Sequence, residues 1–487
     1  MTMNPLHHTL LSAQPDEAPF LSTLDGETIS YGALRAKVAR TAAALAAQGV
    51  KPGDRVLCQI AKAPEGLILY LATVFAGGVF VPLNTGYTPA EVDYFLDDAA
   101  PALLILDAST QAARGVAQAR NVPLVRPSDL TETSLAPLPP CPRKPDDLAA
   151  ILYTSGTTGR SKGAMLTHEN LISNARALQA EWQYQPSDTL IHALPIFHTH
   201  GLFVATNITL AAGADMIFLP AFDLGDIAAA LPRATTMMGV PTFYTRMLGD
   251  DRFERAAMAH MRLVISGSAP LLAETHAAFE ARTGHAILER YGMTETNMIT
   301  SNPYAGARKA GTVGKPLAGV SLRLARHDDQ GIGAIEVTGP NVTPGYWRNP
   351  EKTAETFAPD GWFITGDLGQ IDADGYLSIV GREKDLVISG GFNIYPKEIE
   401  TLIDALPGVL ESAVFGIPHP DLGEAVAAAI VLRPGATADA ETILAALAPN
   451  LARFKTPRSL HFLPELPRNT MGKVQKNELR RNFTGAS

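Results

Sequence analysis

The stretch YTSGTTGRSKGAML at residues 153–166 gathers glycines and hydroxyl side chains directly ahead of a lysine. Glycine lets backbone N–H groups approach an anion closely, hydroxyls add further donors, and Lys162 adds a positive charge. These are the requirements of a polyphosphate-binding loop. The spacing does not fit Gly-x-x-x-x-Gly-Lys-Ser/Thr, so this is not the common P-loop. The alternative is an ordinary surface loop.

Three later segments also carry side chains that suit nucleotide chemistry: YGMTET at 291–296, ITGDLG at 364–369 and PRNTMGKVQK at 467–476. The carboxylate of Glu295 suits a hard cation such as Mg²⁺, and that of Asp367 can accept hydrogen bonds from two ribose hydroxyls. The ammonium of Lys473 can neutralise charge on a phosphate. Taken singly, each has a plain alternative: a capping glutamate, a turn aspartate and a solvated lysine.

Five segments, in this order along the chain, resemble the superfamily of acyl-CoA synthetases, luciferases and adenylation domains: YTSGTTGRSKGA, YGMTET, TGD, GREKDLV and PRNTMGKVQK. The resemblance covers essentially the whole chain. It implies an enzyme with two half-reactions, in which a carboxylate attacks the α-phosphorus of ATP and coenzyme A then displaces AMP from the acyl-adenylate. The implied cofactors are ATP and Mg²⁺, with coenzyme A as co-substrate.

The same resemblance implies roles for individual residues around the phosphates. The residues expected to hold the β- and γ-phosphates are Thr154, Ser155, Gly156, Thr157, Thr158, Gly159 and Lys162. Glu295 and Thr157 are the expected Mg²⁺ ligands, and Thr294 is the expected contact of the α-phosphate. Lys473 is expected to lie over the bond that forms between phosphate and carboxylate, where it stabilises the departing pyrophosphate.

A second set of implied roles surrounds the adenosine and the thiol. The residues expected near the base are Ser266, Gly267, Ser268, Ala269, Glu289, Tyr291, Gly292 and Met293, with the tyrosine stacked on the ring. Asp367 and Arg382 are the expected ribose contacts. Lys384 matches a hinge position, and rotation about a few such residues can open a channel for coenzyme A. Gly390 and Gly391 are expected to line that channel, because they permit close backbone approach.

An arginine, Arg290, directly precedes the YGMTET segment, where this superfamily lines its acyl pocket. A buried guanidinium is costly unless an anion meets it. Because the reacting carboxylate must stay free, a second carboxylate on the substrate is a fitting partner through two parallel hydrogen bonds. Arg290 therefore favours a short dicarboxylic acid. The alternative is an ion pair between Arg290 and a neighbouring carboxylate that faces solvent.

Within the superfamily, four segments resemble the malonate-activating CoA ligases: ERYGMTETNMITSNP, LPIFHTHGLF, MGVPTFYTRML and SGGFNIYPKEIE. That likeness implies that Arg290 holds the distal carboxylate and that Thr199 and Met293 bound the α-carbon. His198 matches a gating position, and His200 and Ser268 are expected beside the acyl group. Methylmalonate use, activation of another short acid, loading of a carrier protein and non-catalytic nucleotide binding remain alternatives.

The elements that must position these residues alternate in type from residue 30 to 106. Helices are expected over 30–49, 65–78 and 88–99, and strands over 54–60, 79–83 and 102–107. Such alternation predicts a parallel sheet covered by helices. A proline-rich connector follows at 135–147. The alternation then resumes, with a helix expected at about 201–212 and a strand at 285–289, so two successive doubly wound α/β lobes are predicted.

The pattern of predicted elements changes near residue 311. From there, short strands with glycine turns predict a small β-barrel-like unit. The expected fold class is therefore α/β: a large N-terminal domain of two lobes plus this unit, followed by a small mobile α+β domain. The predicted boundaries are an adenylate-forming domain at 1–381, a hinge at 382–387 and a lid domain at 388–487.

The composition and net charge limit the classes of binding partner that are expected. The chain has 487 residues and a net charge of −9, so its overall field does not favour nucleic acid or an anionic membrane. Two distant cysteines and no signal or transmembrane pattern predict a cytoplasmic protein with reduced thiols. The expected partners are small molecules, and the sequence does not separate a monomer from a homodimer.

Overall fold

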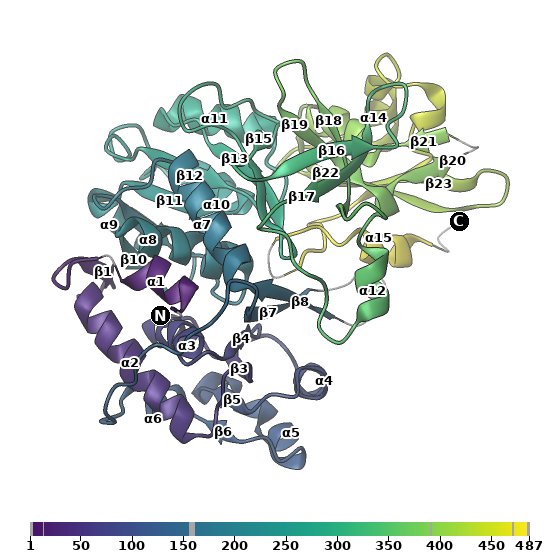
Figure 1. Ribbon diagram of the computed structural model, residues 1–487. Coiled ribbons are helices and arrows are strands. Elements are labelled where there is room, and N and C mark those ends of the chain that lie inside the picture. The colour runs from purple at the N-terminus through teal and green to yellow at the C-terminus, as the bar shows by residue number, and fades with distance from the viewer. Residues whose placement is uncertain (1–2, 13, 155–160, 390–391, 470–471, 485–487) are drawn as a thin grey trace.

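The structure is a computed structural model that describes residues 3–12, 14–154, 161–389, 392–469 and 472–484. A large mixed α/β body carries a small C-terminal domain at the upper right of Figure 1. The expected fold class is confirmed. Among the described residues, no helix combines the length and the apolar character that crossing a membrane requires.

The first lobe is built on a six-stranded sheet in the order β6-β5-β3-β4-β7-β8. Its strands are β3 (Arg55–Gln59), β4 (Val79–Pro82), β5 (Leu103–Leu106), β6 (Leu124–Val125), β7 (Leu148–Thr154) and β8 (Lys162–Thr167). All pairs are parallel except β7 with β8. The helical segments of this lobe are α2 (Tyr31–Ala47), α3 (Pro64–Phe75), α4 (Pro89–Ala99), η1 (Ala108–Ala113), α5 (Arg114–Ala119) and α6 (Pro127–Thr131).

The second lobe has a nine-stranded sheet in the order β15-β14-β13-β12-β11-β9-β10-β1-β2. Its strands are β1 (Pro19–Ser22), β2 (Thr28–Ser30), β9 (Thr189–His192), β10 (Asp215–Phe218), β11 (Thr236–Gly239), β12 (Leu263–Ser266), β13 (Leu288–Met293), β14 (Asn297–Ser301) and β15 (Lys315–Pro316). Its helical segments are α1 (Pro5–Leu11), α7 (His168–Glu181), η2 (His200–Ala205), α8 (Thr206–Ala212), α9 (Leu224–Ala230), η3 (Leu231–Arg233), α10 (Pro241–Leu248) and α11 (Ala273–Thr283).

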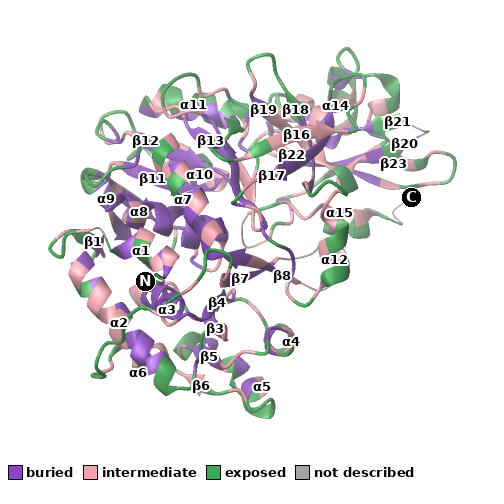
Figure 2. Cartoon of the chain, in the orientation of Figure 1, coloured by how far each residue is buried: buried purple, intermediate pink, exposed green. Residues whose placement is uncertain are grey.

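The expectation of two lobes in strict succession is wrong. The hairpin β1–β2 begins the chain but completes the second sheet, and β7–β8 follow the 135–147 connector but complete the first. One continuous cluster of buried apolar side chains includes residues of both lobes, such as Leu67 and Ile191. Figure 2 shows strands β3, β7 and β11 of the two sheets as mostly buried. The chain crosses between the sheets because both share this core.

Two local expectations also need correction. The helix expected at 201–212 begins as the wider π-turn η2 and becomes regular only at Thr206. The strand expected at 285–289 lies at Leu288–Met293 instead, so it contains Arg290 and Tyr291. This shift places both side chains at the edge where the parallel strands end.

The smaller sheets complete the frame. A four-stranded sheet holds β16 (Ser321–Ala325), β17 (Gly333–Thr338), β18 (Phe363–Ile371) and β19 (Leu377–Arg382), with α12 (Pro350–Glu355) beside it in sequence. After η4 (Glu383–Asp385), the C-terminal domain holds β20 (Val387–Ser389), β21 (Phe392–Ile394), β22 (Val409–His419), β23 (Gly423–Leu432) and β24 (Ser459–Phe462). Its helical segments are α13 (Pro396–Asp404), α14 (Ala440–Leu447), η5 (Arg453–Lys455) and α15 (Lys476–Phe483).

Candidate active site

Strands β12 and β13 run side by side and bring Arg290 against Gly267. Ser266 pairs with Glu289, so the residues that follow each of them also face each other. A β-carbon at position 267 would lie 2.6 Å from Nε of Arg290, closer than packed atoms approach. The guanidinium therefore occupies the space that a side chain at 267 would fill.

Arg290 is buried, with 3% of its surface exposed. Its Nε and Nη2 have no hydrogen-bond partner in the part of the chain that the structure describes. Burial lowers the pKa of Arg290 to about 9, and the nearby Tyr244 opposes that shift. The solvent-facing ion pair considered as an alternative is wrong, because no carboxylate among the described residues pairs with this guanidinium. A buried donor pair of this kind gains most from an anionic partner.

Other buried polar atoms without partners lie in the same two strands and in the segment 198–200. Seven of the sixteen such buried atoms among the described residues belong to His198, Thr199, His200, Ser266, Glu289 and Arg290. Buried polar groups are normally paired, so a concentration of unpaired ones marks a region that binds a polar ligand or water. The sequence had singled out all six of these residues.

His200 lies near the Arg290 charge and His198 precedes it by two residues; burial favours the neutral form of both. Burial lowers the pKa of His198 to about 4, and burial followed by the Arg290 charge lowers that of His200 well below its ordinary value. Nδ1 of His200 lies 3.2 Å from Oγ of Ser268, a half-buried residue with a φ of 72°. Neutral imidazoles can shape and hydrogen-bond an anion without adding a competing charge.

A second constellation lies next to Arg290 along β13. The Tyr291 hydroxyl donates to Asp367 on β18, and Nε of Arg382 lies 2.6 Å from the other carboxylate oxygen of Asp367. Asp367 is 3% exposed, so the aspartate is oriented from two sides. Gly292 follows, and a β-carbon there would lie 2.7 Å from Cα of Met298, which explains why only glycine fits.

Glu295 is buried beyond these residues and is held by a tyrosine that the sequence did not single out. The Tyr346 hydroxyl donates to Oε1 of Glu295 over 2.8 Å, and burial raises the pKa of Glu295. Nζ of Lys162 lies 5.8 Å from the centre of the Tyr346 ring. Lys162 pairs across the β7–β8 hairpin with Thr154. Within the described ranges, no group of three or more His, Cys, Asp or Glu side chains could hold a metal ion.

Lys473 comes from the C-terminal domain to the same region. Its side chain touches solvent, yet the surrounding protein lowers its pKa, chiefly by desolvation and then through Arg382. Asp367, Asp385 and Glu295 act on it in the opposite direction. A β-carbon at Gly472 would lie 3.8 Å from Thr242 of α10, so this segment is near the N-terminal domain.

The remaining predicted residues divide into three groups. Thr294, Met293 and Ala269 are half-buried in the loops and strand end around this region. Lys384 lies in η4, where desolvation lowers its pKa to about 8 although the Asp385 charge opposes that shift. Ser155, Gly156, Thr157, Thr158, Gly159, Gly390 and Gly391 lie outside the described residues.

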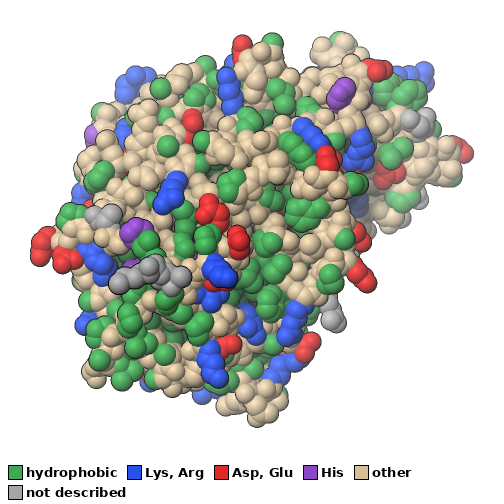
Figure 3. Space-filling view, in the orientation of Figure 1, with side chains coloured by type: hydrophobic (Ala, Val, Ile, Leu, Met, Phe, Trp, Pro, Cys, Tyr) green, Lys and Arg blue, Asp and Glu red, His purple; other side chains and the backbone are tan. Residues whose placement is uncertain are grey.

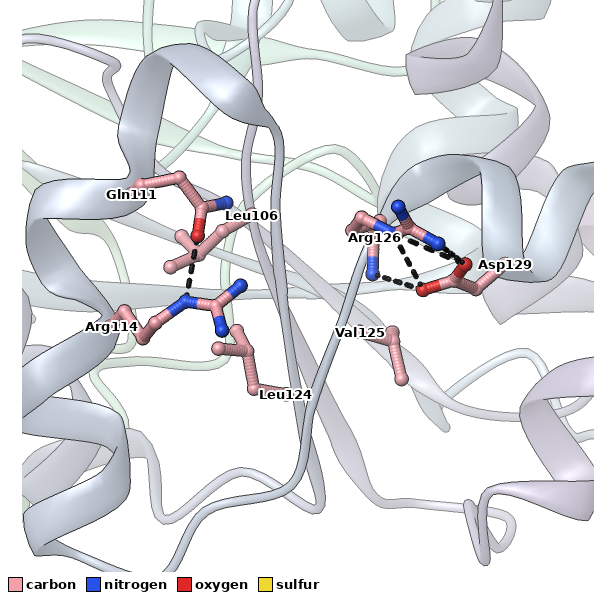
Figure 4. Close-up of a pocket in the computed structure, with 7 residues that line it drawn as sticks. All are labelled: Leu106, Gln111, Arg114, Leu124, Val125, Arg126 and Asp129. Atoms are coloured by element: carbon pink, nitrogen blue, oxygen red, sulfur yellow. Dashed lines mark hydrogen bonds and ion pairs between the residues drawn. The ribbon is translucent and has the colours of Figure 1, made fainter.

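One cavity among the described residues lies away from Arg290. Figure 3 shows acidic and basic side chains interspersed over the viewed face. A cavity of about 120 Å³ in the first lobe is drawn in Figure 4, where Arg126 pairs with Asp129 and Arg114 with Gln111. Because these polar side chains already pair with one another, this cavity is a weaker candidate for a ligand site than the strand ends around Arg290.

Comparison with known proteins identifies the family of the chain. The model of the AMP-binding enzyme family matches residues 10–347, and that of the AMP-binding enzyme C-terminal domain matches residues 398–473. ATP-bound MatB from Rhodopseudomonas palustris is 52% identical, covers 100% of both chains and superposes with a TM-score of 0.97.

Two curated relatives differ in the acid they are named for. A feruloyl-CoA synthase of Amycolatopsis sp is 38% identical over 94% of this chain and 94% of its own length. A malonate–CoA ligase of Arabidopsis thaliana is 37% identical over 85% of this chain and 75% of its own length. The superfamily inferred from the sequence motifs is confirmed, and the chain belongs to the AMP-binding enzymes.

Proposed function

We propose that this protein is an ATP-dependent ligase that activates malonate as malonyl-AMP and transfers the malonyl group to coenzyme A. The products are malonyl-CoA, AMP and pyrophosphate. The observation that carries this proposal is the buried guanidinium of Arg290, whose Nε and Nη2 have no partner among the described residues. The named activity of the Arabidopsis thaliana relative supports the same substrate.

Arg290 directly precedes a residue of the proposed nucleoside site. Arg290 and Tyr291 are consecutive, so their α-carbons are about 3.8 Å apart. Tyr291 belongs to the constellation proposed to hold the nucleoside, because its hydroxyl donates to Asp367. The proposed acid site and nucleoside site thus use neighbouring residues of β13, whose side chains point to opposite faces of the strand.

A feruloyl-type substrate is the less suitable alternative. An aromatic acid with one carboxylate must leave that group free to react, so it offers no anion to Arg290. The desolvated guanidinium would then stay unpaired, which costs on the order of 1–3 kcal/mol or more. Methylmalonate and other short acids remain compatible with Arg290, and so does loading of a separate carrier protein.

The first half-reaction brings two anions together. A carboxylate oxygen of malonate bonds to the α-phosphorus as the bond from phosphorus to the bridging oxygen of pyrophosphate breaks. We assign Lys473 to the charge that develops there, supported by its electrostatic interaction with Asp367 and Glu295. Thr294 would contact the α-phosphate, and Lys162 the outer phosphates. Such preorganised charges stabilise the transition state without later rearrangement.

The buried carboxylate of Glu295 fits a magnesium site. Mg²⁺ is often bound by one or two carboxylates with phosphate oxygens and waters completing its shell. One carboxylate, oriented by Tyr346, meets that requirement without a larger acidic group. The ion would supply charge neutralisation at the phosphates. Thr157, proposed as a second ligand, lies outside the described residues.

The second half-reaction needs access for the thiol. We propose domain boundaries at 1–381 and 388–487, with 382–387 as the hinge. Among the described residues, two polar contacts join the proposed domains: Tyr395 donates to Asp328 over 2.8 Å, and Arg433 pairs with Glu274 at 2.9 Å. Both would break on rotation about Lys384, after which coenzyme A attacks the acyl carbon and AMP leaves.

We place this activity in the cytoplasm, where ATP and coenzyme A are available. The two cysteines, Cys58 and Cys141, are unpaired, which suits a reducing compartment. The test of the proposed function is ATP–pyrophosphate exchange with malonate, methylmalonate, succinate, acetate and ferulate. Exchange driven best by malonate supports the proposal. Exchange driven best by acetate or ferulate contradicts it.

A further inference from the structure

In the π-turn η2, one backbone carbonyl oxygen accepts three hydrogen bonds. The carbonyl oxygen of Gly201 accepts the backbone N–H of Thr206, the Thr206 hydroxyl at 3.0 Å and Nε2 of His192 at 2.9 Å. A β-carbon at Gly201 would also lie 2.9 Å from the carbonyl carbon of Pro195. Single π-turns are rare and often occur at functional sites. Here the turn begins at His200, beside the candidate acyl-binding residues.

The contacts of His192 determine its protonation state. A carbonyl can only accept, so Nε2 of His192 must carry the hydrogen that points to Gly201. Nδ1 then has a lone pair, and it lies 3.1 Å from Nζ of Lys62. An Nδ1–H form would oppose donor to donor at Lys62 and acceptor to acceptor at Gly201. Burial and then the Lys62 charge lower the pKa of His192 well below its ordinary value, so the ring is neutral.

Lys62 reaches this ring from the first lobe, just before α3. Its Nζ donates to the carbonyl of His192 over 2.6 Å as well as to Nδ1, and it lies 4.3 Å from the centre of the Phe218 ring. Among the described residues, no carboxylate charge acts on its pKa. Burial lowers the pKa of Lys62, while the carbonyl, the imidazole and the ring face all favour the ammonium form.

These contacts form a relay of defined polarity from one lobe to the other. Lys62 donates to His192, His192 donates to Gly201, and Gly201 directly follows His200, whose Nδ1 faces Ser268. We propose that Lys62 and His192 are positioning residues for the acyl-binding segment 198–200. They hold this segment in place and so increase the affinity for the acid, without touching the acid themselves. This inference rests on the proposed function of that segment.

The kinetic test compares Lys62→Met with Lys62→Arg. Methionine keeps the length of the side chain but removes its donors, so the π-turn loses its support. In pyrophosphate exchange with the best acid of the panel, we expect Lys62→Met to raise KM for the acid about tenfold, because small displacements of binding groups are costly. KM for ATP should stay within about twofold, and Lys62→Arg should recover most of the loss.

The matched control is Lys51→Met, at an exposed lysine of the same lobe. It should change neither constant. Parallel rises in both KM values for Lys62→Met, or no change in either, would overturn the proposal. Lys62→Gln, a neutral donor, replaces the methionine variant if that protein does not fold. Using the best acid of the panel keeps this test separate from the question of whether that acid is malonate.

A spectroscopic measurement tests the relay without any substrate. In protein with ¹⁵N-labelled histidine, His192 should be neutral with its proton on Nε2 at pH 7, and the signal is assigned by its loss in His192→Gln. Lys62→Met should shift the Nδ1 resonance by removing its hydrogen bond, whereas Lys51→Met should not. A proton on Nδ1 in the wild-type protein would contradict the polarity of the relay.

Discussion

The guanidinium of Arg290 lies against the α-carbon of Gly267, so closely that a β-carbon there would be 2.6 Å from Nε. The contact leaves the charge buried beside neutral His200 and without an acidic partner among the described residues. A glycine at 267 is thus a condition for an arginine at 290. Together they create a fixed positive site that a second carboxylate can satisfy.

Gly267→Ala tests this condition without touching the arginine. The added methyl group must displace the guanidinium, so kcat/KM for malonate should fall about 100-fold, the order expected for misplaced binding groups. Acetate activation should fall much less, because acetate has no second carboxylate. Gly115→Ala is the control, since nothing lies within 4 Å of its β-carbon position. Equal losses on both acids would show that Gly267 supports the fold rather than Arg290.

Lys473→Ala should separate the two half-reactions. Adenylate formation should fall by on the order of 10²-fold or more, because a preorganised charge at the transferring phosphoryl group is lost. Conversion of supplied malonyl-AMP and coenzyme A should stay near the wild-type rate. Rapid-quench assays of each step provide the measurement. A comparable decrease in both steps would refute the assignment of Lys473 to the first one.

Tyr346→Phe should weaken magnesium binding. The hydroxyl that orients Glu295 is removed while the ring beside Lys162 remains. Loss of such an orienting hydrogen bond costs about tenfold or more in metal affinity, so the Mg²⁺ concentration for half-maximal exchange should rise by that factor. Tyr376→Phe is the control, because its hydroxyl donates to Ala307 instead. An unchanged Mg²⁺ requirement would argue against Glu295 as the ligand.

Glu289 should make the stability of the protein depend on pH. Burial raises its pKa to about 8 in the folded state, above the unfolded value of about 4.3. The folded state therefore binds the extra proton between these values, and this contribution to stability decreases as pH rises from about 4.3 to 8. Glu289→Gln, which resembles the protonated acid, should remove that decrease. Thermal unfolding from pH 5 to 8.5 provides the comparison, and identical pH profiles would contradict the burial argument.

Local signals in the sequence were enough for several elements. A helix was expected over 88–99, and α4 begins there at Pro89, where the structure has a full capping box between Thr88 and Glu91. Helix α3 and strand β5 were equally evident because each is a continuous apolar run. Regular elements with strong caps or unbroken apolar runs are decided locally, so sequence reasoning locates them.

The elements that the sequence did not predict depend on contacts between distant segments. Strand β9 has four residues and ends in His192, a residue type that gives no strand signal, yet it lies inside the second sheet. The π-turn has no local signature, because it results from the donors that converge on Gly201. For the site, the sequence indicated that Arg290 needs an anion, but the packing on Gly267 and the support of Glu295 by Tyr346 required the fold.

The most direct measurement is pyrophosphate exchange by the wild-type protein and Arg290→Ala with malonate and with acetate. The account predicts that the wild-type protein uses malonate far better than acetate. Arg290→Ala should reduce kcat/KM for malonate about 100-fold or more, since it removes one partner of a buried charged pair, and should change acetate use little. Equal effects on the two acids, or a wild-type preference for acetate, would contradict the claim that Arg290 selects a dicarboxylic acid.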